Sequence, residues 1–343
     1  MLSKVRILAA IITLAATTAF AQQPQFLHAR LTTASADHGL NAELDSLRRE
    51  AAPLWVGYNI PVAEKTFSDR YPRIDYLEAD HPTYKEEDAT SSSETSYDHA
   101  VLLFRIANHA IEKIRVENPN RQVDAGNLRV VWLSNIAPGD SIAVLKSLAL
   151  SNDEKKLRDN AVFAISIHRS PETLPTLIGL AAPANPLDLR EKAAFWVATQ
   201  HSHAGFAALQ NFARKDTDAA FREKIAFDLN VSNDPDAVKE LIRMAHQDAS
   251  PQVRRQAQFW MATKGGKVVA GDLRDLAEND PDTQVRKSAV FALSRLPQPE
   301  ATTQLIQVAG TSKDPAVRKQ AVFWLGQSRD PRALDYLTRL LQQ

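Results

Sequence analysis

One ten-residue phrase recurs six times in this chain, and each copy begins 32 residues after the copy before it. The first copy reads LRDNAVFAIS from Leu157, and the last reads VRKQAVFWLG from Val317. An arginine and a phenylalanine keep their places in every copy: Arg158, Arg190, Arg222, Arg254, Arg286 and Arg318, then Phe163, Phe195, Phe227, Phe259, Phe291 and Phe323. A fixed period of this length indicates an array in which every copy is the same small structural unit.

Each copy predicts two helices. Val317, Ala321 and Leu325 are four residues apart with polar residues between them, as on the buried side of an amphipathic helix, which we call the first helix of the repeat. After a breaker such as Asp330-Pro331, a second helix follows. Its apolar side carries Leu177, Leu209, Leu241, Leu273, Leu305 and Leu337. Because two short helices cannot bury their apolar sides alone, we expect the copies to stack as a solenoid, with the recurring Phe and Leu in its core.

The residue after the recurring phenylalanine alternates between large and small. The column runs Trp132, Ala164, Trp196, Asp228, Trp260, Ala292 and Trp324. Trp132 indicates a seventh, weaker copy, so we expect an array of about seven repeats over residues 125–343. We interpret the alternation as packing of each indole against a neighbouring copy that leaves room. A ligand-binding row of aromatic side chains is the alternative interpretation.

The recurring arginine also has two interpretations. An acidic residue stands four positions earlier in several copies, as Asp218 does before Arg222 and Asp282 before Arg286. This spacing predicts ion pairs at the starts of the first helices, which tie the loops together. A stripe of arginines that binds an anion is the functional alternative.

The phrase D-P-x-V-R-x-x-A-x-x-x-L, present from Asp314 to Leu325, resembles HEAT repeats of the short type named after phycobilisome lyases. The resemblance covers residues 125–343. It implies an all-α, right-handed αα superhelix whose second helices line a concave, protein-binding surface. The segments 53–64 and 123–133 are similar to an N-terminal module that precedes such arrays in exported bacterial proteins of unknown function.

Residues 1–21 have the pattern of a secretory signal peptide: a charged start, a short apolar run and Ala19-Phe20-Ala21 as a cleavage site. A retained N-terminal anchor is the alternative, but the run is shorter than the roughly 20 residues that span a bilayer. We therefore expect a periplasmic or secreted protein without a membrane span in the mature chain. The sequence contains no cysteine, which excludes a thiolate nucleophile and a cysteine zinc site.

Residues 22–124 predict a small α+β module. Leucines at helical spacing predict a helix from Leu40 to Ala51, and the strand formers from Leu54 to Ile60 predict a strand. Residues 100–106 and 110–116 flank Asn108-His109 like the arms of a hairpin. The polar segment 84–98 is expected to be an exposed or disordered loop.

No catalytic motif stands out. The iron-dependent hydroxylases of this architecture use His-Glu pairs, and no histidine here precedes a glutamate. Phycobilin lyases act on pigment proteins in the cytosol, which conflicts with a signal peptide. His201-Ser202-His203 could bind a metal, but we interpret it as an exposed turn. A Gly-x-Ser-x-Gly nucleophile motif is absent. We expect a protein that is not an enzyme, with no cofactor and no metal.

We expect the partner to be a protein or a peptide. Lys plus Arg and Asp plus Glu both total 41, so the overall charge does not indicate a polyanionic partner. The exposed column predicted for the second helices has mixed charge and no aromatic residue, which argues against nucleic acid. Its candidate contact residues are Arg243, Asp275, Gln307 and Arg339. The sequence thus predicts a monomeric scaffold that binds its partner along the concave face.

Two other functions stay open. One is an enzyme or a small-ligand-binding protein whose site lies between the N-terminal module and the first repeats. Trp55, Tyr58 and His109 are its candidate residues. The other is a spacer in the cell envelope without a specific partner.

Overall fold

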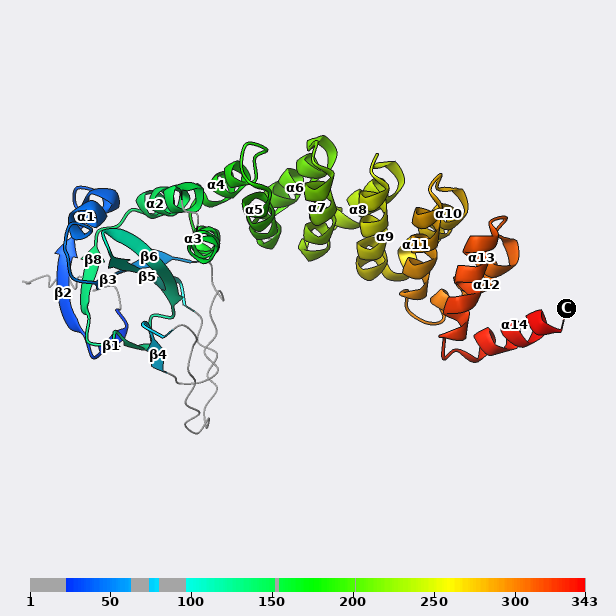
Figure 1. The fold of residues 1–343 in the computed structure, drawn as a ribbon, viewed down its shortest axis with the longest axis horizontal. Helices are drawn as coiled ribbons and strands as arrows, with labels where there is room; N and C mark the ends of the chain where they lie inside the picture. The colour runs from blue at the N-terminus through cyan, green and yellow to red at the C-terminus, as the bar shows by residue number, and fades with distance from the viewer. Residues whose placement is uncertain (1–22, 63–73, 80–96, 152–153, 201, 343) are drawn as a thin grey trace, which may run out of the picture.

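The computed structural model describes residues 23–62, 74–79, 97–151, 154–200 and 202–342. A small β-rich module is followed by an array of helices that extends away from it (Figure 1). The predicted signal peptide and most of the predicted loop at 84–98 lie outside the described residues. The fold is therefore an α-solenoid joined to a sheet module. The predicted all-α class applies to the solenoid and not to the module.

The module is built on a five-stranded mixed sheet. Its strands, in spatial order, are β2 (Arg30–Ser35), β8 (Arg129–Ser134), β3 (Leu54–Pro61), β5 (His99–Ala107) and β6 (Ala110–Glu117). β3 pairs in parallel with β8 and antiparallel with β5. The predicted hairpin is β5–β6, and its turn residues Asn108 and His109 have φ of 51° and 62°. Positive φ at both positions is what a two-residue hairpin turn of type I′ requires.

Each face of this sheet is buried against a different element. Side chains alternate along β3, so Tyr58 faces the helices while Trp55 faces away from them. The helical face also contacts α1 (Leu40–Leu47), the predicted first helix. The other face has its own small core. A three-stranded sheet completes the module: β1 (Gln25–Leu27), β7 (Gln122–Asp124) and β4 (Ile74–Tyr76).

The predicted start of the array near Ala125 is wrong. Residues 129–134 form strand β8, and Trp132 packs edge-on against Phe26, with 6.0 Å between the ring centres, in the core of the module. The run Val130-Val131-Trp132 consists of good strand formers, and the match of Trp132 to the helical period is a coincidence. The array starts instead with α2 (Pro138–Ser151). This helix occupies the position of a second helix, but strand β8 precedes it instead of a first helix. The sheet occupies the place of the missing helix.

Six complete copies follow α2. The first helices are α3 (Lys155–Ile167), α5 (Leu187–Thr199), α7 (Ala219–Val231), α9 (Pro251–Gly265), α11 (Thr283–Ser294) and α13 (Pro315–Gly326). The second helices are α4 (Thr173–Leu180), α6 (His203–Lys215), α8 (Ala237–Gln247), α10 (Ala270–Asn279, after the 3₁₀ turn η1 at Gly266–Val269), α12 (Glu300–Thr311) and α14 (Pro331–Leu341). None of the helices in the described part of the chain is both long and apolar enough to cross a bilayer.

One continuous apolar core runs from the helical face of the sheet to the last repeat. Val317, Ala321 and Leu325 lie in it, as the helical spacing predicts. The leucines of the first five second helices are also buried, whereas Leu337, on the last described helix, is partly exposed. This is the arrangement of a stacked array, in which each copy completes the core of its neighbour.

The recurring phenylalanines do not lie in this core. Five of them are half-buried, and Phe323 is 53% exposed. Each phenylalanine stands two residues after a buried residue of its helix, an alanine in five copies and Ile225 in α7, and this turns it about 200° away from the buried ridge. The prediction that Phe163, Phe195, Phe227, Phe259, Phe291 and Phe323 form the repeat core is therefore wrong.

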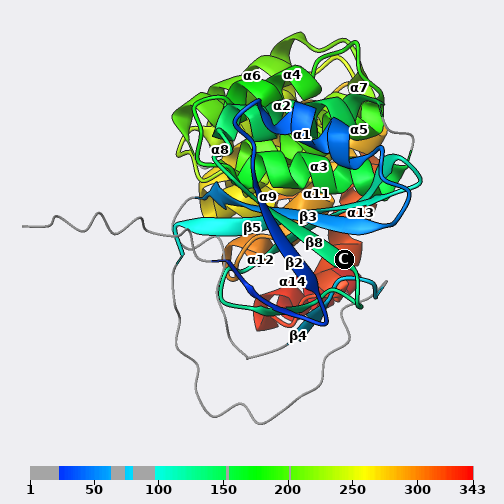
Figure 2. The same cartoon turned by 90° about the vertical axis from the view of Figure 1, so that its left-hand side faces the viewer.

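The first helices form the inner layer of the array. Each first helix packs directly on the next, while consecutive second helices make fewer contacts with one another. Closer spacing on one side bends a stack toward that side, and Figure 1 shows the array bending along its length. The expectation that the second helices line the inner surface is therefore wrong. At the N-terminal end the sheet lies beside α2 and α3 (Figure 2).

Candidate functional site

A row of aromatic rings follows the solvent-exposed side of the first helices. Neighbouring rings contact one another along the whole row, with ring centres 4.8–6.2 Å apart. The row comprises Phe163, Trp196, Phe195, Phe227, Trp260, Phe259, Phe291, Trp324 and Phe323. We call the exposed side of the first helices, with this row, the first-helix face.

The row repeats every two copies. The indole of Trp260 packs on Phe227 of the preceding copy, with ring centres 5.0 Å apart, and Trp196 packs in the same way on Phe163, at 5.1 Å. Between these pairs, Phe195 and Phe227 stack nearly parallel, at 6.2 Å. The predicted packing of each indole on a neighbouring copy thus exists, but it takes place at the surface. The same indoles therefore pack on a neighbouring copy and remain partly exposed, so the packing and the ligand-binding interpretations are compatible.

Two hollows open on the first-helix face beside these pairs. The first, of about 580 Å³, is lined by Phe163 and Trp196 together with Asp159, Asn160 and Lys192. The second, of about 510 Å³, is lined by the residues that stand 64 positions later: Phe227, Trp260, Glu223, Lys224 and Gln256. We call these hollows the aromatic niches. Two hollows at equivalent positions are a property of the repeat and not of one irregular loop.

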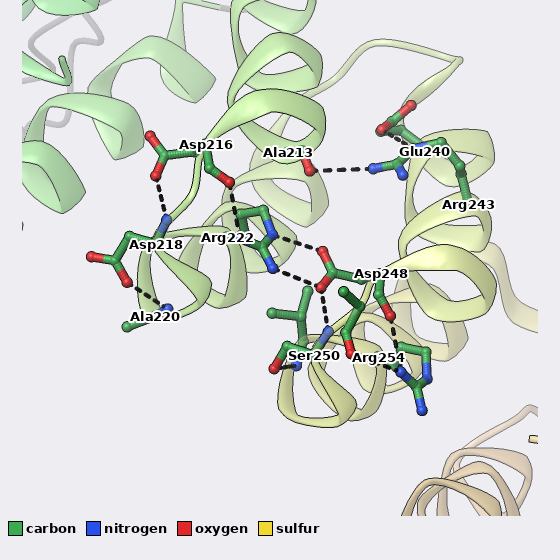
Figure 3. A network of polar contacts seen from close by, with 12 residues as sticks. Ala213, Asp216, Asp218, Ala220, Arg222, Glu240, Arg243, Asp248, Ser250 and Arg254 are labelled. Carbon is green, nitrogen blue, oxygen red and sulfur yellow. Dashed lines mark hydrogen bonds and ion pairs between the residues drawn. The ribbon is translucent and has the colours of Figure 1, made fainter. Parts of the chain in front are cut away.

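The recurring arginines form a second periodic feature, inside the loops. Arg222 donates from Nε and Nη2 to the Asp248 carboxylate, at 2.8 and 2.9 Å. Arg254 does the same to Asp280, at 2.8 and 3.0 Å, and also donates to the backbone carbonyl of Asp248, at 2.9 Å. Each of these arginines therefore joins two successive loops. Figure 3 shows both sets of contacts for Arg222 and, for Arg254, the contact with the backbone of Asp248. We call this chain of contacts the arginine ladder.

The ladder continues toward both ends of the array. Arg158 pairs with Asp188, Arg190 with Asp216, and Arg286 with Asp314. Arg318, in the last copy, donates only to the backbone carbonyl of Ser312 among the described residues. Burial opposes the ionisation of Asp248, but the hydrogen bonds from Arg222 and from the Ser250 amide outweigh it and lower the pKa.

Among the described residues, the predicted ion pairs of Asp218 with Arg222 and of Asp282 with Arg286 do not form. Asp218 and Asp282 instead accept hydrogen bonds from backbone amides at the N-termini of α7 and α11, as capping residues. The interpretation that the arginines tie the loops together holds, but their carboxylate partners belong to the next loop. The sequence contained the signal for these partners, since Asp216, Asp248 and Asp280 also recur at the 32-residue period.

The family comparison agrees with this geometry. The family model described as HEAT repeats matches residues 271–343, from the start of α10 to the end of the chain. This part of the array consists of HEAT repeats, and the earlier copies have the same 32-residue pattern. No curated protein matches the chain closely in sequence.

Solved structures of three proteins resemble the HEAT array. The complex of CpcE and CpcF of phycocyanin lyase from Nostoc has 22% sequence identity and a TM-score of 0.35, and the match covers 46% of this chain and 100% of that one. Human deoxyhypusine hydroxylase, in complex with glycerol, has 15% identity and a TM-score of 0.32, covering 59% and 78%. YibA from Escherichia coli has 20% identity and a TM-score of 0.38, covering 59% and 76%. At such low identities and TM-scores, these structures transfer no activity to this chain.

The four partner-binding residues predicted from the sequence lie on the second helices of the HEAT array, away from the first-helix face. Arg243 donates to Glu240, and also to the carbonyl of Ala213, so its guanidinium is already engaged (Figure 3). Gln307 accepts from Arg274 at 2.7 Å, and Asp275 accepts from Asn279 at 2.7 Å. Arg339 is exposed and donates to the carbonyl of Asp335, at 3.2 Å. The structure does not bring these four side chains together with the aromatic niches.

The alternative site at the junction of the module and the HEAT array is not formed by its predicted residues. Trp55 is buried on the far face of the sheet, where its indole donates to Glu78 at 2.8 Å. His109 is in the hairpin turn and contacts the backbone carbonyl of Arg48. Tyr58 is buried on the helical face. The three side chains therefore point to different places, and no common site results.

Tyr58 belongs instead to a buried hydrogen-bonded chain that joins the module to the HEAT array. His168 Nδ1 lies 2.6 Å from the carbonyl oxygen of Ala164, so Nδ1 must carry the proton and Nε2 must accept. Ser141 donates to this Nε2 at 2.9 Å, and the Tyr58 hydroxyl donates to Ser141, also at 2.9 Å. Every member is buried and satisfied, and burial raises the pKa of Tyr58. We interpret the chain as a structural connection.

This connection predicts a pH dependence of stability. Burial lowers the pKa of His168 to about 4, from 6.5 in the unfolded chain. Between these values the unfolded chain binds a proton that the folded protein excludes, so the stability present above pH 6.5 decreases as the pH falls. At pH 5 we expect the loss from this group to be about 2 kcal/mol.

Urea denaturation of wild type and His168→Gln between pH 4 and pH 8 measures this loss. The variant lacks the titrating group but keeps its net charge at neutral pH, so the difference between the two curves isolates His168. A difference that stays constant with pH would show that the imidazole titrates normally in the folded protein.

In the sequence His201-Ser202-His203, helix α6 begins at His203. Ser202 accepts a hydrogen bond from the Gly205 amide, as an N-cap, and His203 pairs with Asp234 at 2.9 Å. His201 lies outside the described residues. In the part of the chain that the structure describes, no group of three or more potential metal ligands is found.

Proposed function

We propose that this protein is a non-catalytic scaffold that holds an extended segment of a partner protein along the first-helix face of its HEAT array. The observation that carries the proposal is the pair of aromatic niches at equivalent positions 64 residues apart. Half-exposed rings of Phe163, Trp196, Phe227 and Trp260 offer apolar contact area that is already ordered by ring packing. Such fixed aromatic positions are typical anchor points for a bound peptide.

The spacing of the niches suits an extended chain. Neighbouring helices pack about 8–10 Å apart, so niches two copies apart are about 16–20 Å apart. An extended peptide rises about 3.3 Å per residue and covers this distance in about five or six residues. A partner segment with apolar side chains at that interval could occupy both niches at once.

Selection from an unbiased library of displayed peptides tests this proposal. We expect the selected sequences to carry large apolar residues about five or six positions apart. Their binding is expected to change the intrinsic fluorescence, because three of the five tryptophans belong to the aromatic row. Selected sequences without a recurring apolar spacing would contradict the proposal.

Two variants locate the binding surface. Ala220 is exposed and lines the second niche, so Ala220→Trp fills that niche without removing a packed side chain. We expect it to weaken peptide binding at least about tenfold, as the loss of one buried anchor does. Leu334→Ala removes an exposed apolar side chain on α14, outside the first-helix face, and serves as the control. Equal affinities of the two variants would place the binding site elsewhere.

The proposal also includes export, a monomeric state and a right-handed superhelix. Export rests on the signal-peptide pattern of residues 1–21. Mass spectrometry of the protein from the periplasmic fraction tests it, with a mature N-terminus near Gln22 as the expected result. Sedimentation equilibrium tests the monomer, and an experimental structure tests the handedness.

A further inference from the structure

The charged side chains beside the aromatic row change sign half-way along the array. In every first helix, the residue four positions before the recurring phenylalanine lies one helical turn away from it on the same face. This column runs Asp159, Glu191, Glu223, Arg255, Lys287 and Lys319. The first three copies therefore carry an acid beside the ring, and the last three carry a base.

The acidic half of the column is neutralised within the protein. Lys192 pairs with Asp159 at 3.2 Å, and Lys155 approaches the same carboxylate at 3.8 Å. Lys224 lies on the face next to Glu223, with its ammonium 4.6 Å from the centre of the Phe227 ring. Acids and bases thus alternate over α3, α5 and α7, and this half of the face has no strong preference for one charge.

The basic half has no such neutralisation. The residues next to Arg255, Lys287 and Lys319 on the face are Gln256, Ser288 and Gln320, and none of them carries a charge. Among the described residues, none of the three bases forms an ion pair, although Arg255 is near enough to Asp282 to contribute to its lowered pKa. The Asp282 carboxylate is engaged with the backbone amides of α11. Three uncompensated positive charges therefore follow the aromatic row over α9, α11 and α13.

We propose that the segment bound over α9, α11 and α13 is an acidic peptide, in which carboxylates alternate with large apolar side chains. The apolar side chains would contact the ring row at Phe259, Phe291 and Trp324, and the carboxylates would pair with the bases beside it. Copies about 8–10 Å apart require acids about three residues apart in an extended chain. This inference rests on the proposed function, because it names the chemistry of the segment that the first-helix face binds.

The geometry favours a peptide over a nucleic acid, which is also an anion. Single strands bind by stacking their bases on free aromatic faces. On this surface the rings cover one another: Phe259 and Phe291 stack with planes 9° apart, and Trp324 packs against both Phe291 and Phe323. Their exposed parts form an apolar strip that suits aliphatic and aromatic side chains.

Fluorescence anisotropy with three labelled peptides tests the inference on the full-length protein. All three carry tryptophans about six residues apart, and glutamate, glutamine or lysine stands at about every third position between them. We expect the glutamate peptide to bind at least about tenfold more tightly than the glutamine peptide at low salt, and the lysine peptide to bind most weakly. The preference for glutamate is expected to decrease as salt is added.

Charge reversal on the protein supplies the matched control. Lys287→Glu with Lys319→Glu is expected to abolish the preference for the glutamate peptide. Lys267→Glu with Lys313→Glu changes the net charge equally at two exposed lysines outside the column and is expected to preserve it. If both double variants lose the preference equally, general charge attraction explains it and the inference is wrong.

The outcomes separate this inference from the proposed function. If the glutamine peptide binds as tightly as the glutamate peptide, and Ala220→Trp still weakens both, the acidic chemistry is wrong while the peptide-binding function stands. If none of the three peptides binds, both proposals fail. If labelled single-stranded oligothymidylate binds more tightly than the glutamate peptide and loses affinity in Lys287→Glu with Lys319→Glu, the basic half binds nucleic acid and the inference is overturned.

Discussion

Replacing Arg254 by alanine is expected to lower the free energy of unfolding by about 3–5 kcal/mol, as measured by urea denaturation. Arg254 is only 7% exposed, and its guanidinium donates to the Asp280 carboxylate twice, as well as to the backbone of the preceding loop. Its removal leaves the carboxylate of Asp280 in a buried position without its cation. An unpaired buried charge costs far more than the loss of an exposed salt bridge.

The last copy supplies the control for this prediction. Arg318 occupies the same position in α13, but among the described residues it donates to one backbone carbonyl and to no carboxylate. Arg318→Ala is therefore expected to cost only about 1 kcal/mol, the value of a single hydrogen bond. If both substitutions destabilise the protein equally, the carboxylate contacts of the arginine ladder contribute nothing.

A double replacement tests whether the ion pair itself stabilises the protein. When Arg254→Met is combined with Asp280→Leu, no charge is left unpaired, and apolar side chains fill the loop contact. Such exchanges of a buried ion pair for apolar residues are often neutral or stabilising. We expect the double variant to unfold within about 1 kcal/mol of wild type. A loss as large as that of Arg254→Ala alone would show that the pair itself stabilises the junction between copies.

The sequence predicted the helices of the array because their signal is local. The four-residue spacing of Val317, Ala321 and Leu325 depends only on the helical period, and the structure buries all three. The hairpin at Asn108-His109 was predictable for the same reason, since its turn requires particular backbone angles at two adjacent residues. Features that one helix or one turn determines alone can be derived from the sequence.

Contacts between copies were predicted less well. The carboxylate partner of Arg254 is 26 residues away, and a carboxylate four residues from an arginine is a plausible partner until the loops are placed in space. Asp280 could have been identified from its own 32-residue recurrence, but its contact with Arg254 depends on how the copies stack. The prediction for the recurring phenylalanines was wrong for the same reason, because a wide apolar face on one helix does not reveal which part of it the neighbouring copy covers.

The prediction of where the module ends was wrong for a different reason. The strand that contains Trp132 was assigned to the array because its tryptophan matches the 64-residue alternation, although valines and a tryptophan favour a strand. The sign change from Glu223 to Arg255 was visible in the sequence, but its importance depends on the aromatic row beside it. The aromatic niches themselves could be located only after the structure placed Phe227 of one copy against Trp260 of the next.

Replacing Asp228 by alanine is expected to stabilise the protein. Asp228 follows the recurring phenylalanine in α7, where the equivalent residues two copies away are Ala164 and Ala292. Its side chain is fully buried, and neither carboxylate oxygen has a hydrogen-bond partner among the described residues. A buried polar group without a partner costs about 1–3 kcal/mol, and an ionised one costs more. Asp228→Ala removes this cost and leaves a residue that the array already accommodates at two equivalent positions.

The reverse substitution supplies an independent measurement. Ala292 is buried at the equivalent place in α11, so Ala292→Asp introduces a carboxyl group without a prepared partner. We expect it to lower the free energy of unfolding by about 3–5 kcal/mol at pH 7, the usual cost of an uncompensated buried charge. If Asp228→Ala destabilises the protein while Ala292→Asp is tolerated, the column favours a carboxyl group and the physical argument is wrong.

The stabilisation by Asp228→Ala is expected to increase with pH. Burial raises the pKa of Asp228 well above 3.8; the nearby Lys224 ammonium opposes this rise, and the Glu191 carboxylate adds to it. Above pH 3.8 the unfolded chain releases a proton that the folded protein retains, so this group makes wild type progressively less stable until the pH passes the folded-state pKa.

Asp228→Asn keeps a buried polar group but cannot ionise, so it is expected to lack this pH dependence while staying less stable than Asp228→Ala. Urea denaturation of the three proteins between pH 4 and pH 8 tests this order, and a constant difference between wild type and Asp228→Ala would mean that the carboxyl group ionises freely in the folded protein.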